Sequence, residues 1–139
     1  MLCEKAGKLE TGGVLVGRYN KGLDEAVVTS VLPPPPDSRF GRRWFVRGIS
    51  GLAEVFRAKW RRGEYYLGEW HFHPGGYPDA SDDDESEAFD LARAPSYHCP
   101  EVVLVIVARR GDIWELSARV FERGGSVPVL LAPSPQPLP

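Results

Sequence analysis

The stretch at residues 68–90 reads GEWHFHPGGYPDASDDDESEAFD. Its first part is rich in aromatic residues and is typical of a strand that ends at Pro74. Side chains two residues apart on a strand leave the same face of the sheet. We therefore expect His71 and His73 to point toward one ion, while Phe72 faces the opposite side and the core.

A helix is expected after the turn, from about Asp82 to Arg93. Ser81 stands where its N-cap should be, and the acidic residues that follow suit the positive end of a helix dipole. With Ser81 as the cap, Asp84 is the third helical residue and faces the same open end. Asp84 is thus the expected third ligand, with Asp82 and Asp83 as alternatives.

Two neutral histidines and one carboxylate are a ligand set that leaves the fourth tetrahedral position of a zinc ion to water. Zinc lowers the pKa of that water to about 7. Glu10, in the segment LETGGVLVGRY, is the expected base that accepts its proton and passes it to a leaving amine. An oxygen acceptor is also expected for the second N–H of a ligating histidine, and a carboxylate of the acidic helix is the candidate.

These residues resemble the JAMM metalloproteases, also called catalytic MPN domains. The family pattern is a glutamate in an E-[ST]-G-G-like context, then H-x-H-P, about six residues, and S-x-x-D. The chain matches it at Glu10, His71, His73, Pro74, Ser81 and Asp84. It departs from the pattern at Phe72, where the family usually has Ser or Thr. It also has only nine residues before Glu10, where members usually have a strand and a helix.

The resemblance implies an α/β (α+β) fold, a curved mixed β-sheet flanked by helices in a single domain, with the metal at the sheet edge. It implies that His71, His73 and Asp84 bind Zn²⁺ and that Glu10 and Ser81 are catalytic. The Ser81 hydroxyl would donate a hydrogen bond to the oxyanion or position the water.

The activity implied by the resemblance is hydrolysis of the peptide or isopeptide bond after the C-terminal Gly-Gly of a ubiquitin-like protein. The chain is most similar to bacterial deubiquitinase-like members, often encoded beside ubiquitin-activating-like and ubiquitin-conjugating-like enzymes, some of them in antiphage defence. Processing of a sulfur-carrier protein is an alternative within the family. Outside it, a non-catalytic MPN scaffold and a two-histidine, one-carboxylate iron oxygenase are the alternatives.

Composition limits the possible classes of function. A chain of 139 residues is expected to form one domain, here residues 1–126, followed by a proline-rich tail at 127–139. The net charge of -2 does not favour a nucleic acid or a membrane as partner. No apolar run is long enough for a membrane helix or a signal peptide, and two cysteines do not make a disulfide framework. We therefore expect a cytoplasmic protein.

The remaining strands are expected from apolar, β-branched runs. A hairpin should span residues 12–33, and a central strand covered on both faces should span residues 101–108. A further strand is expected at 113–121.

Two basic segments lie between the hairpin and the histidines. Residues 39–47 are interpreted as a long, basic, aromatic loop, either a solvated surface or a contact surface for an acidic or apolar partner. Apolar residues at helical spacing predict an amphipathic helix over 49–62, with Trp60 in the core and Gly63 capping its end.

Overall fold

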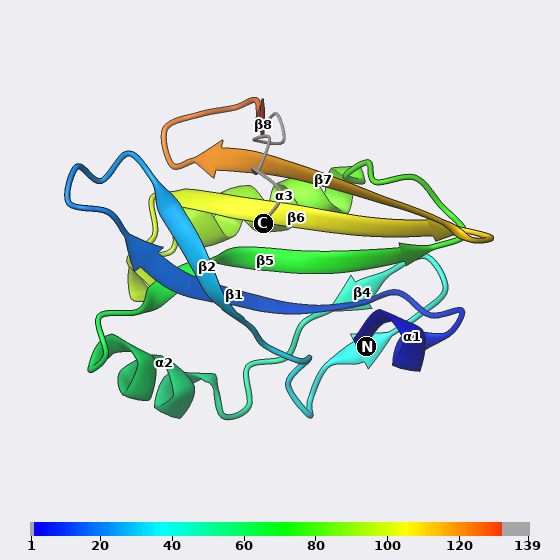
Figure 1. The fold of residues 1–139 in the computed structure, drawn as a ribbon, viewed down its shortest axis with the longest axis horizontal. Coiled ribbons are helices and arrows are strands. Elements are labelled where there is room, and N and C mark those ends of the chain that lie inside the picture. Colours follow the sequence, from blue (N-terminus) through cyan, green and yellow to red (C-terminus); the bar gives the residue numbers. More distant parts are fainter. Residues whose placement is uncertain (1, 132–139) are drawn as a thin grey trace, which may run out of the picture.

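The computed structural model describes residues 2–131, and a six-stranded sheet forms its centre (Figure 1). The strands occur in the order β2-β1-β5-β6-β7-β8, and every neighbouring pair is antiparallel except β5 and β6. They are β1 (Thr11–Tyr19), β2 (Ala26–Val31), β5 (Tyr65–Pro74), β6 (Glu101–Arg110), β7 (Ile113–Glu122) and β8 (Val129–Leu131). The strands expected within residues 12–33, 101–108 and 113–121 are therefore present.

Three α-helices flank this sheet, namely α1 (Leu2–Ala6), α2 (Leu52–Trp60) and α3 (Asp82–Arg93). Helix α3 connects the parallel strands β5 and β6, and a short 3-10 helix at Pro95–Tyr97 completes the connection. In Figure 1, α3 lies behind the sheet and α1 lies in front of it. The expected α+β fold, with a mixed sheet flanked by helices, is confirmed.

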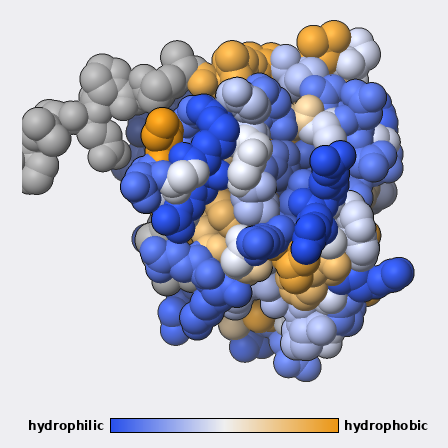
Figure 2. All heavy atoms as spheres, turned by 90° about the vertical axis from the view of Figure 1, so that its right-hand side faces the viewer, coloured by the Kyte–Doolittle hydropathy of each residue, from blue (hydrophilic) through white to orange (hydrophobic). Residues whose placement is uncertain are grey.

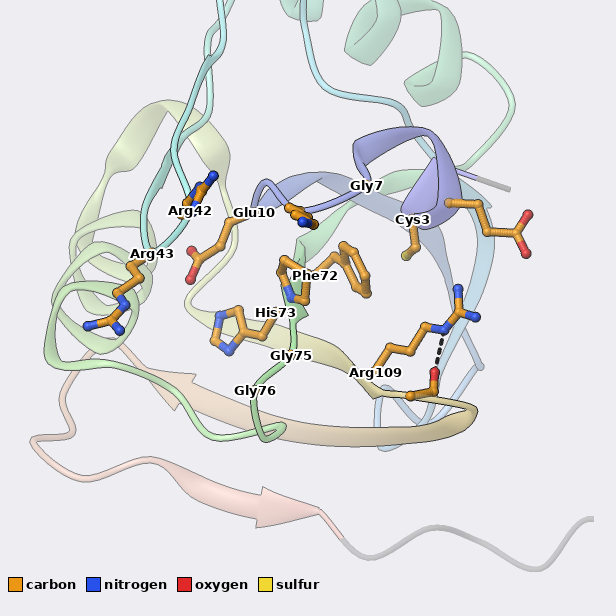
Figure 3. A pocket seen from close by; sticks show the side chains of 14 residues that line it. Cys3, Gly7, Glu10, Arg42, Arg43, Phe72, His73, Gly75, Gly76 and Arg109 are labelled. Atoms are coloured by element: carbon orange, nitrogen blue, oxygen red, sulfur yellow. Dashed lines mark hydrogen bonds between the residues drawn. The ribbon is translucent and has the colours of Figure 1, made fainter.

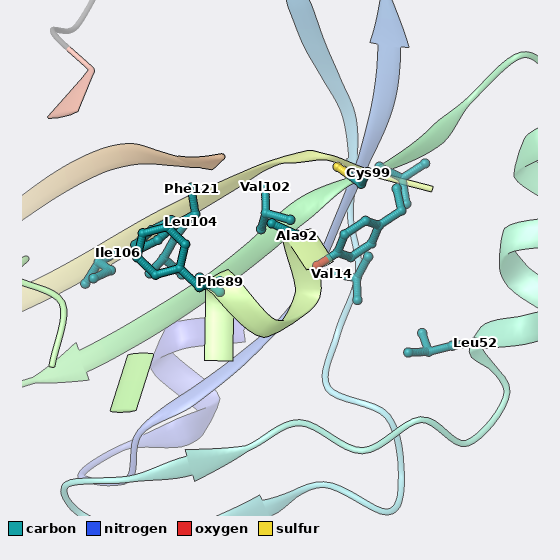
Figure 4. Close-up of a cluster of buried hydrophobic side chains, with 12 residues drawn as sticks. Val14, Leu52, Phe89, Ala92, Cys99, Val102, Leu104, Ile106 and Phe121 are labelled. Atoms are coloured by element: carbon teal, nitrogen blue, oxygen red, sulfur yellow. The ribbon is translucent and has the colours of Figure 1, made fainter. Parts of the chain in front are cut away.

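Each face of the sheet carries its own apolar cluster. The larger cluster lies between the sheet and α3, where Phe89 packs edge-on against Phe121 at a ring distance of 4.9 Å (Figure 4). The smaller cluster lies on the other face, where Cys3 of α1 joins Trp70 and Phe72. Phe72 therefore points away from the histidines, as its place between them predicts.

Strand β6 is central, but its two faces are not covered equally. Val102, Leu104 and Ile106 are buried in the cluster under α3. Val105 and Val107, on the other face, are only partly buried. The prediction of a strand covered on both faces is thus wrong in part, because the five-residue helix α1 covers less of the sheet than α3 does.

Helix α2 is shorter than predicted, and the prediction for one of its residues, Trp60, is wrong. Trp60 is 68% exposed, so the prediction that it belongs to the core is wrong. The helix contacts the main cluster through Leu52 and Phe56, which are one turn apart. Trp60 is the last helical residue, where the chain turns away through Gly63 at φ +72, so it extends past the sheet.

The segment predicted as a loop at residues 39–47 is instead a small hairpin. Strands β3 (Arg39–Phe40) and β4 (Phe45–Val46) pair antiparallel, with Phe40 opposite Phe45 and their rings 5.5 Å apart. This aromatic cross-strand pair stabilises the hairpin. The prediction of an irregular loop is therefore corrected.

The C-terminal end adds a strand to the region expected as a tail. Strand β8 pairs with β7, with Leu131 opposite Ala118. The domain boundary at residue 126 stays a prediction, and the proline-rich residues 132–139 lie outside the described part of the chain. Among residues 2–131, none of the helices has the length and apolar character needed to cross a membrane.

Candidate metal centre

The two histidines lie at the end of β5, on the face that α3 covers. His71 is 5% exposed and lies opposite Ile106 of β6, while His73 lies opposite Ala108. Gly12 of β1 pairs with His71, and a Cβ at Gly12 would come within 2.9 Å of the His71 ring and 2.4 Å of the Trp70 carbonyl. The glycine therefore allows β1 to approach the histidine strand closely.

The start of α3 supplies the carboxylate. Ser81 has extended backbone geometry and caps the helix, as predicted. The N–H of Asp84 donates to Ser81 Oγ at 3.1 Å, and the N–H of Ser81 donates to Asp84 Oδ2 at 2.9 Å. This reciprocal capping box fixes the position of the Asp84 carboxylate.

These elements bring His71, His73 and Asp84 into one buried group. His71 Nδ1 lies 3.1 Å from Asp84 Oδ1, and His73 Nε2 lies 3.4 Å from Asp84 Oδ2. The ligand atoms of the three residues are all within 4.8 Å of one another. Asp82 and Asp83, which the sequence left open as alternatives, are exposed and do not join this group.

The chemistry of the group fits a metal ion. His73 Nε2 is buried and has no hydrogen-bond partner among the described residues, although Asp84 is near. His73 Nδ1 lies 3.3 Å from the main-chain carbonyl of Tyr77, to which it can donate, so Nε2 keeps its lone pair. Two imidazoles and a carboxylate are the usual ligand types of zinc and of several other transition metals. A buried, unsatisfied imidazole nitrogen is otherwise costly, so a cation is its natural partner.

A main-chain oxygen serves as the outer acceptor of His73. The carboxylate that the sequence suggested for one of the two histidines does not contact His73 Nδ1, which lies near the Tyr77 carbonyl instead. The loop between β5 and α3 turns back toward His73 and brings the main chain within reach. Such an outer acceptor fixes the tautomer and the ring orientation of a ligand.

The charges of the group perturb each other's pKa values. Burial alone would raise the pKa of Asp84, but His71, His73 and the Ser81 N–H outweigh it and hold that pKa well below its usual range. Burial would lower the pKa of His73, but Asp84 and Glu10 outweigh it and raise this pKa. The carboxylate therefore remains ionised at neutral pH, as a metal ligand must.

Glu10 lies beside the group, immediately before β1. Its neighbour Thr11 pairs with Phe72, so the antiparallel register puts Glu10 across from His73. Burial raises the pKa of Glu10, with a smaller contribution from Asp84, while the two histidines oppose the rise. Figure 3 shows Glu10 and His73 entering the same pocket. A half-buried carboxyl with a raised pKa is suited to accept and return a proton.

Two separate pockets adjoin the group, one beside His73 and the other beside His71 and Asp84. One, of about 670 Å³, is lined by Glu10, His73 and the hairpin arginines Arg42 and Arg43. The other, of about 310 Å³, lies between β5 and α3 and is lined by residues that include His71 and Asp84. An extended substrate crossing the group would therefore find space on both sides.

A buried ion pair, which the sequence analysis did not identify, lines the smaller pocket. Arg47, just after β4, donates through Nε to Glu69 Oε1 at 3.0 Å and Oε2 at 2.8 Å. The Tyr66 hydroxyl also donates to Glu69 at 2.8 Å, and Arg47 donates to the Tyr97 hydroxyl at 2.7 Å. Glu69 precedes His71 by two residues, and this spacing on a buried strand face is the one signal that could have revealed it.

Comparison with known proteins finds relatives of this chain. Residues 2–119 match the family described as prokaryotic homologs of the JAB domain. The chain is 43% identical over 125 residues to a protein of Enterobacter hormaechei subsp. hoffmannii (strain UCI 50) named "CD-NTase/cGAS isopeptidase". The match covers 88% of this chain and 68% of that protein.

Two solved structures share the fold at low sequence identity. A solution structure from Desulfitobacterium hafniense superposes with a TM-score of 0.68 at 19% identity, covering 93% of this chain and 80% of that one. A second, from Salinibacter ruber, gives a TM-score of 0.52 at 19% identity, covering 84% and 71%.

Proposed function

Because the chain belongs to the family of prokaryotic JAB-domain homologues, we propose that it is a zinc-dependent isopeptidase that releases a protein conjugated through its C-terminus. The observation that carries the proposal is the convergence of two histidines and an aspartate beside a half-buried glutamate. The name of the 43% identical relative supports the reaction class. The iron oxygenase and the scaffold are less consistent with these findings, since neither gives Glu10 a role.

In this proposal His71, His73 and Asp84 would hold a zinc ion. When bound there, zinc would supply the Lewis acidity that polarises the scissile carbonyl and lowers the pKa of the attacking water. The capping box keeps Asp84 in position, and the Tyr77 carbonyl keeps Nε2 of His73 free to bind. The chain's contribution is thus a preorganised set of donor atoms.

Glu10 moves the proton. Its carboxylate accepts a proton from the attacking water and then gives it to the nitrogen of the departing amine. The raised pKa supports this role, because a carboxyl poised nearer neutrality can serve in turn as base and acid.

Ser81 stabilises the negative charge that develops on the carbonyl oxygen. Its oxygen already accepts the N–H of Asp84, and its own hydroxyl proton remains available to donate. The side chain is exposed at the open end of α3, where the helix N-terminus also favours negative charge. A donor in such a position typically contributes a rate factor of about 10² to 10³.

Two kinds of conjugated protein are candidate substrates. The motif resemblance favours a ubiquitin-like protein ending in Gly-Gly, attached to its target by ubiquitin-activating-like and ubiquitin-conjugating-like enzymes of the cytoplasm. The relative's name favours a CD-NTase/cGAS-type enzyme as the conjugated protein. Processing of a sulfur carrier remains the alternative within the first kind.

A pair of fusions tests the proposal and separates these substrates. Each has a carrier joined by its C-terminus to a fluorescent reporter, the carrier being a Gly-Gly-terminated ubiquitin-like protein or a CD-NTase. We expect the zinc-loaded protein to cut at least one fusion at the carrier's C-terminus, as mass spectrometry of the products would show. Cleavage of neither fusion would contradict the proposed activity on these substrates.

A further inference from the structure

The basic segment at residues 39–47 has no role in the chemistry proposed above, yet it reaches the metal group. Its tip is a tight turn in which the N–H of Gly41 donates to the Trp44 carbonyl at 2.9 Å. The Gly41 carbonyl in turn accepts the N–H of Glu10 at 2.8 Å. These hydrogen bonds hold the main chain of Arg42 and Arg43, the two residues inside the turn, next to Glu10, the proposed base.

The hairpin is anchored at its base as well as at its tip. Phe45 packs edge-on against His71 at a ring distance of 5.7 Å. Arg47 forms an ion pair with Glu69 in which its Nε donates to both carboxylate oxygens. These contacts hold the hairpin to the strand that bears the histidines. The main chain at the tip is thus fixed relative to the metal group, and the two arginine side chains extend from a defined position.

The charges at the tip have no partner within the described residues. Arg42 and Arg43 are exposed, and the structure gives neither an ion pair nor a hydrogen bond. Two further cations, Lys8 and Arg109, line the same pocket, and its carboxylates are those of Glu4 and Glu10. Figure 2, which views this end of the sheet, shows strongly hydrophilic side chains gathered there. The pocket on the Glu10 side therefore carries an excess of positive charge.

The pocket on the other side of the metal group has the opposite character. Its one cation, Arg47, is neutralised by Glu69, and Asp84 belongs to the metal group, so the carboxylates of Glu87 and Asp90 set the charge of this pocket. A substrate that crosses the group thus meets positive charge on one side and negative charge on the other. In the proposed reaction Glu10 protonates the departing amine. The part of the substrate that bears this amine therefore lies in the pocket beside Glu10, which we call the amine side.

We propose that Arg42 and Arg43 select substrates with acidic residues on the amine side of the scissile bond. This rests on the proposed function, because Glu10 defines the amine side. The target protein would then bear aspartates or glutamates near its modified amine, and the arginines would pair with them. Since the pairs are exposed, each contributes modestly, and the two together favour an acidic over a neutral sequence about three- to tenfold.

The cleavage test varies only the residues after the scissile bond. The carrier is followed by Ser-Asp-Glu-Asp, its neutral isostere Ser-Asn-Gln-Asn, or Ser-Lys-Arg-Lys. We expect kcat/KM to fall in that order, and the Arg42→Glu/Arg43→Glu variant to prefer the basic sequence. A matched Arg61→Glu/Arg62→Glu variant, changed at exposed positions at the far end of β5, should keep the wild-type order. Equal rates on all three sequences would overturn the proposal.

A binding test keeps this proposal separable from the proposed function. The fluorescently labelled peptides Ser-Asp-Glu-Asp-Ala and Ser-Asn-Gln-Asn-Ala are titrated with the protein, and anisotropy gives the ratio of their Kd values. We expect tighter binding of the acidic peptide, lost in Arg42→Glu/Arg43→Glu and weakened at high salt. Failure to cut any carrier would contradict the proposed function, whereas equal binding of both peptides would overturn the role of the arginines.

Discussion

The two sides of the metal group treat charge in opposite ways. On the His71 side, Arg47 and Glu69 are buried and paired, with side-chain exposures of 10% and 4%. On the His73 side, Arg42 and Arg43 are exposed and unpaired among the described residues. Paired buried charges fix geometry, while unpaired exposed charges are available to a ligand. The first side therefore positions the site, and the second is free to recognise a substrate.

Arginine substitutions on the two sides give the largest expected contrast. Arg47→Met leaves the Glu69 carboxylate buried without its cation, so we expect a loss of about 3–5 kcal/mol in the free energy of unfolding. Arg42→Met removes an unpaired surface charge and should change it by less than about 0.5 kcal/mol. Urea unfolding measures both values.

A further variant decides why Arg47 matters. Arg47→Met/Glu69→Leu replaces the whole pair by apolar groups, and most of the lost stability should return. Similar losses for Arg47→Met and Arg42→Met would remove the distinction between the two sides.

Ser81 tests whether the open end of α3 serves catalysis as well as structure. Ser81→Ala removes the helix cap and should lower the free energy of unfolding by about 1 kcal/mol. If its hydroxyl also stabilises the oxyanion, kcat/KM should fall about 10²- to 10³-fold while bound zinc is retained. Ser86→Ala, at an exposed position in the same helix, is the matched control and should change neither.

The expected decrease in rate far exceeds what partial unfolding could cause in a protein that remains mostly folded. A rate that follows only the folded fraction would assign Ser81 a structural role alone. Circular dichroism at the assay temperature provides that fraction.

Zinc affinity should depend on pH through His73. Its pKa is raised in the metal-free chain, since Asp84 and Glu10 outweigh the effect of burial. A raised pKa keeps the proton on Nε2 to higher pH, so protons compete with zinc below that value. We expect the zinc Kd to be constant at pH values above the His73 pKa and to increase about tenfold for each unit of pH below that pKa.

The pH below which the zinc Kd begins to increase should lie above the ordinary histidine pKa of about 6.5. Titration against a competing chelator at a series of pH values measures it. An onset in the acidic range of ordinary carboxylates would contradict the arrangement of charges around His73.

Local sequence patterns were enough to predict one part of this architecture. The strand that ends at Pro74, the cap at Ser81 and the outward turn of Phe72 follow from residues close to one another in the chain. The third position of the helix favoured Asp84 over Asp82 and Asp83 only together with the family pattern.

The ion pair between Arg47 and Glu69 could not be predicted from local patterns. Arg47 and Glu69 are distant in sequence, and only the closing of the β3–β4 hairpin onto β5 brings them together. Trp60 fitted the apolar period of its helix, but the period does not say where a helix leaves the sheet. Long-range packing decided both cases.

The central claim is that His71, His73 and Asp84 bind zinc and that Glu10 transfers the proton. The most direct measurement is bound zinc and cleavage of a carrier fusion for the wild type, Glu10→Gln and Asp84→Ala, side by side. We predict that cleavage is lost in both variants, while stoichiometric zinc is lost only in Asp84→Ala. Cleavage at the wild-type rate by Glu10→Gln, or full zinc content in Asp84→Ala, would contradict the account.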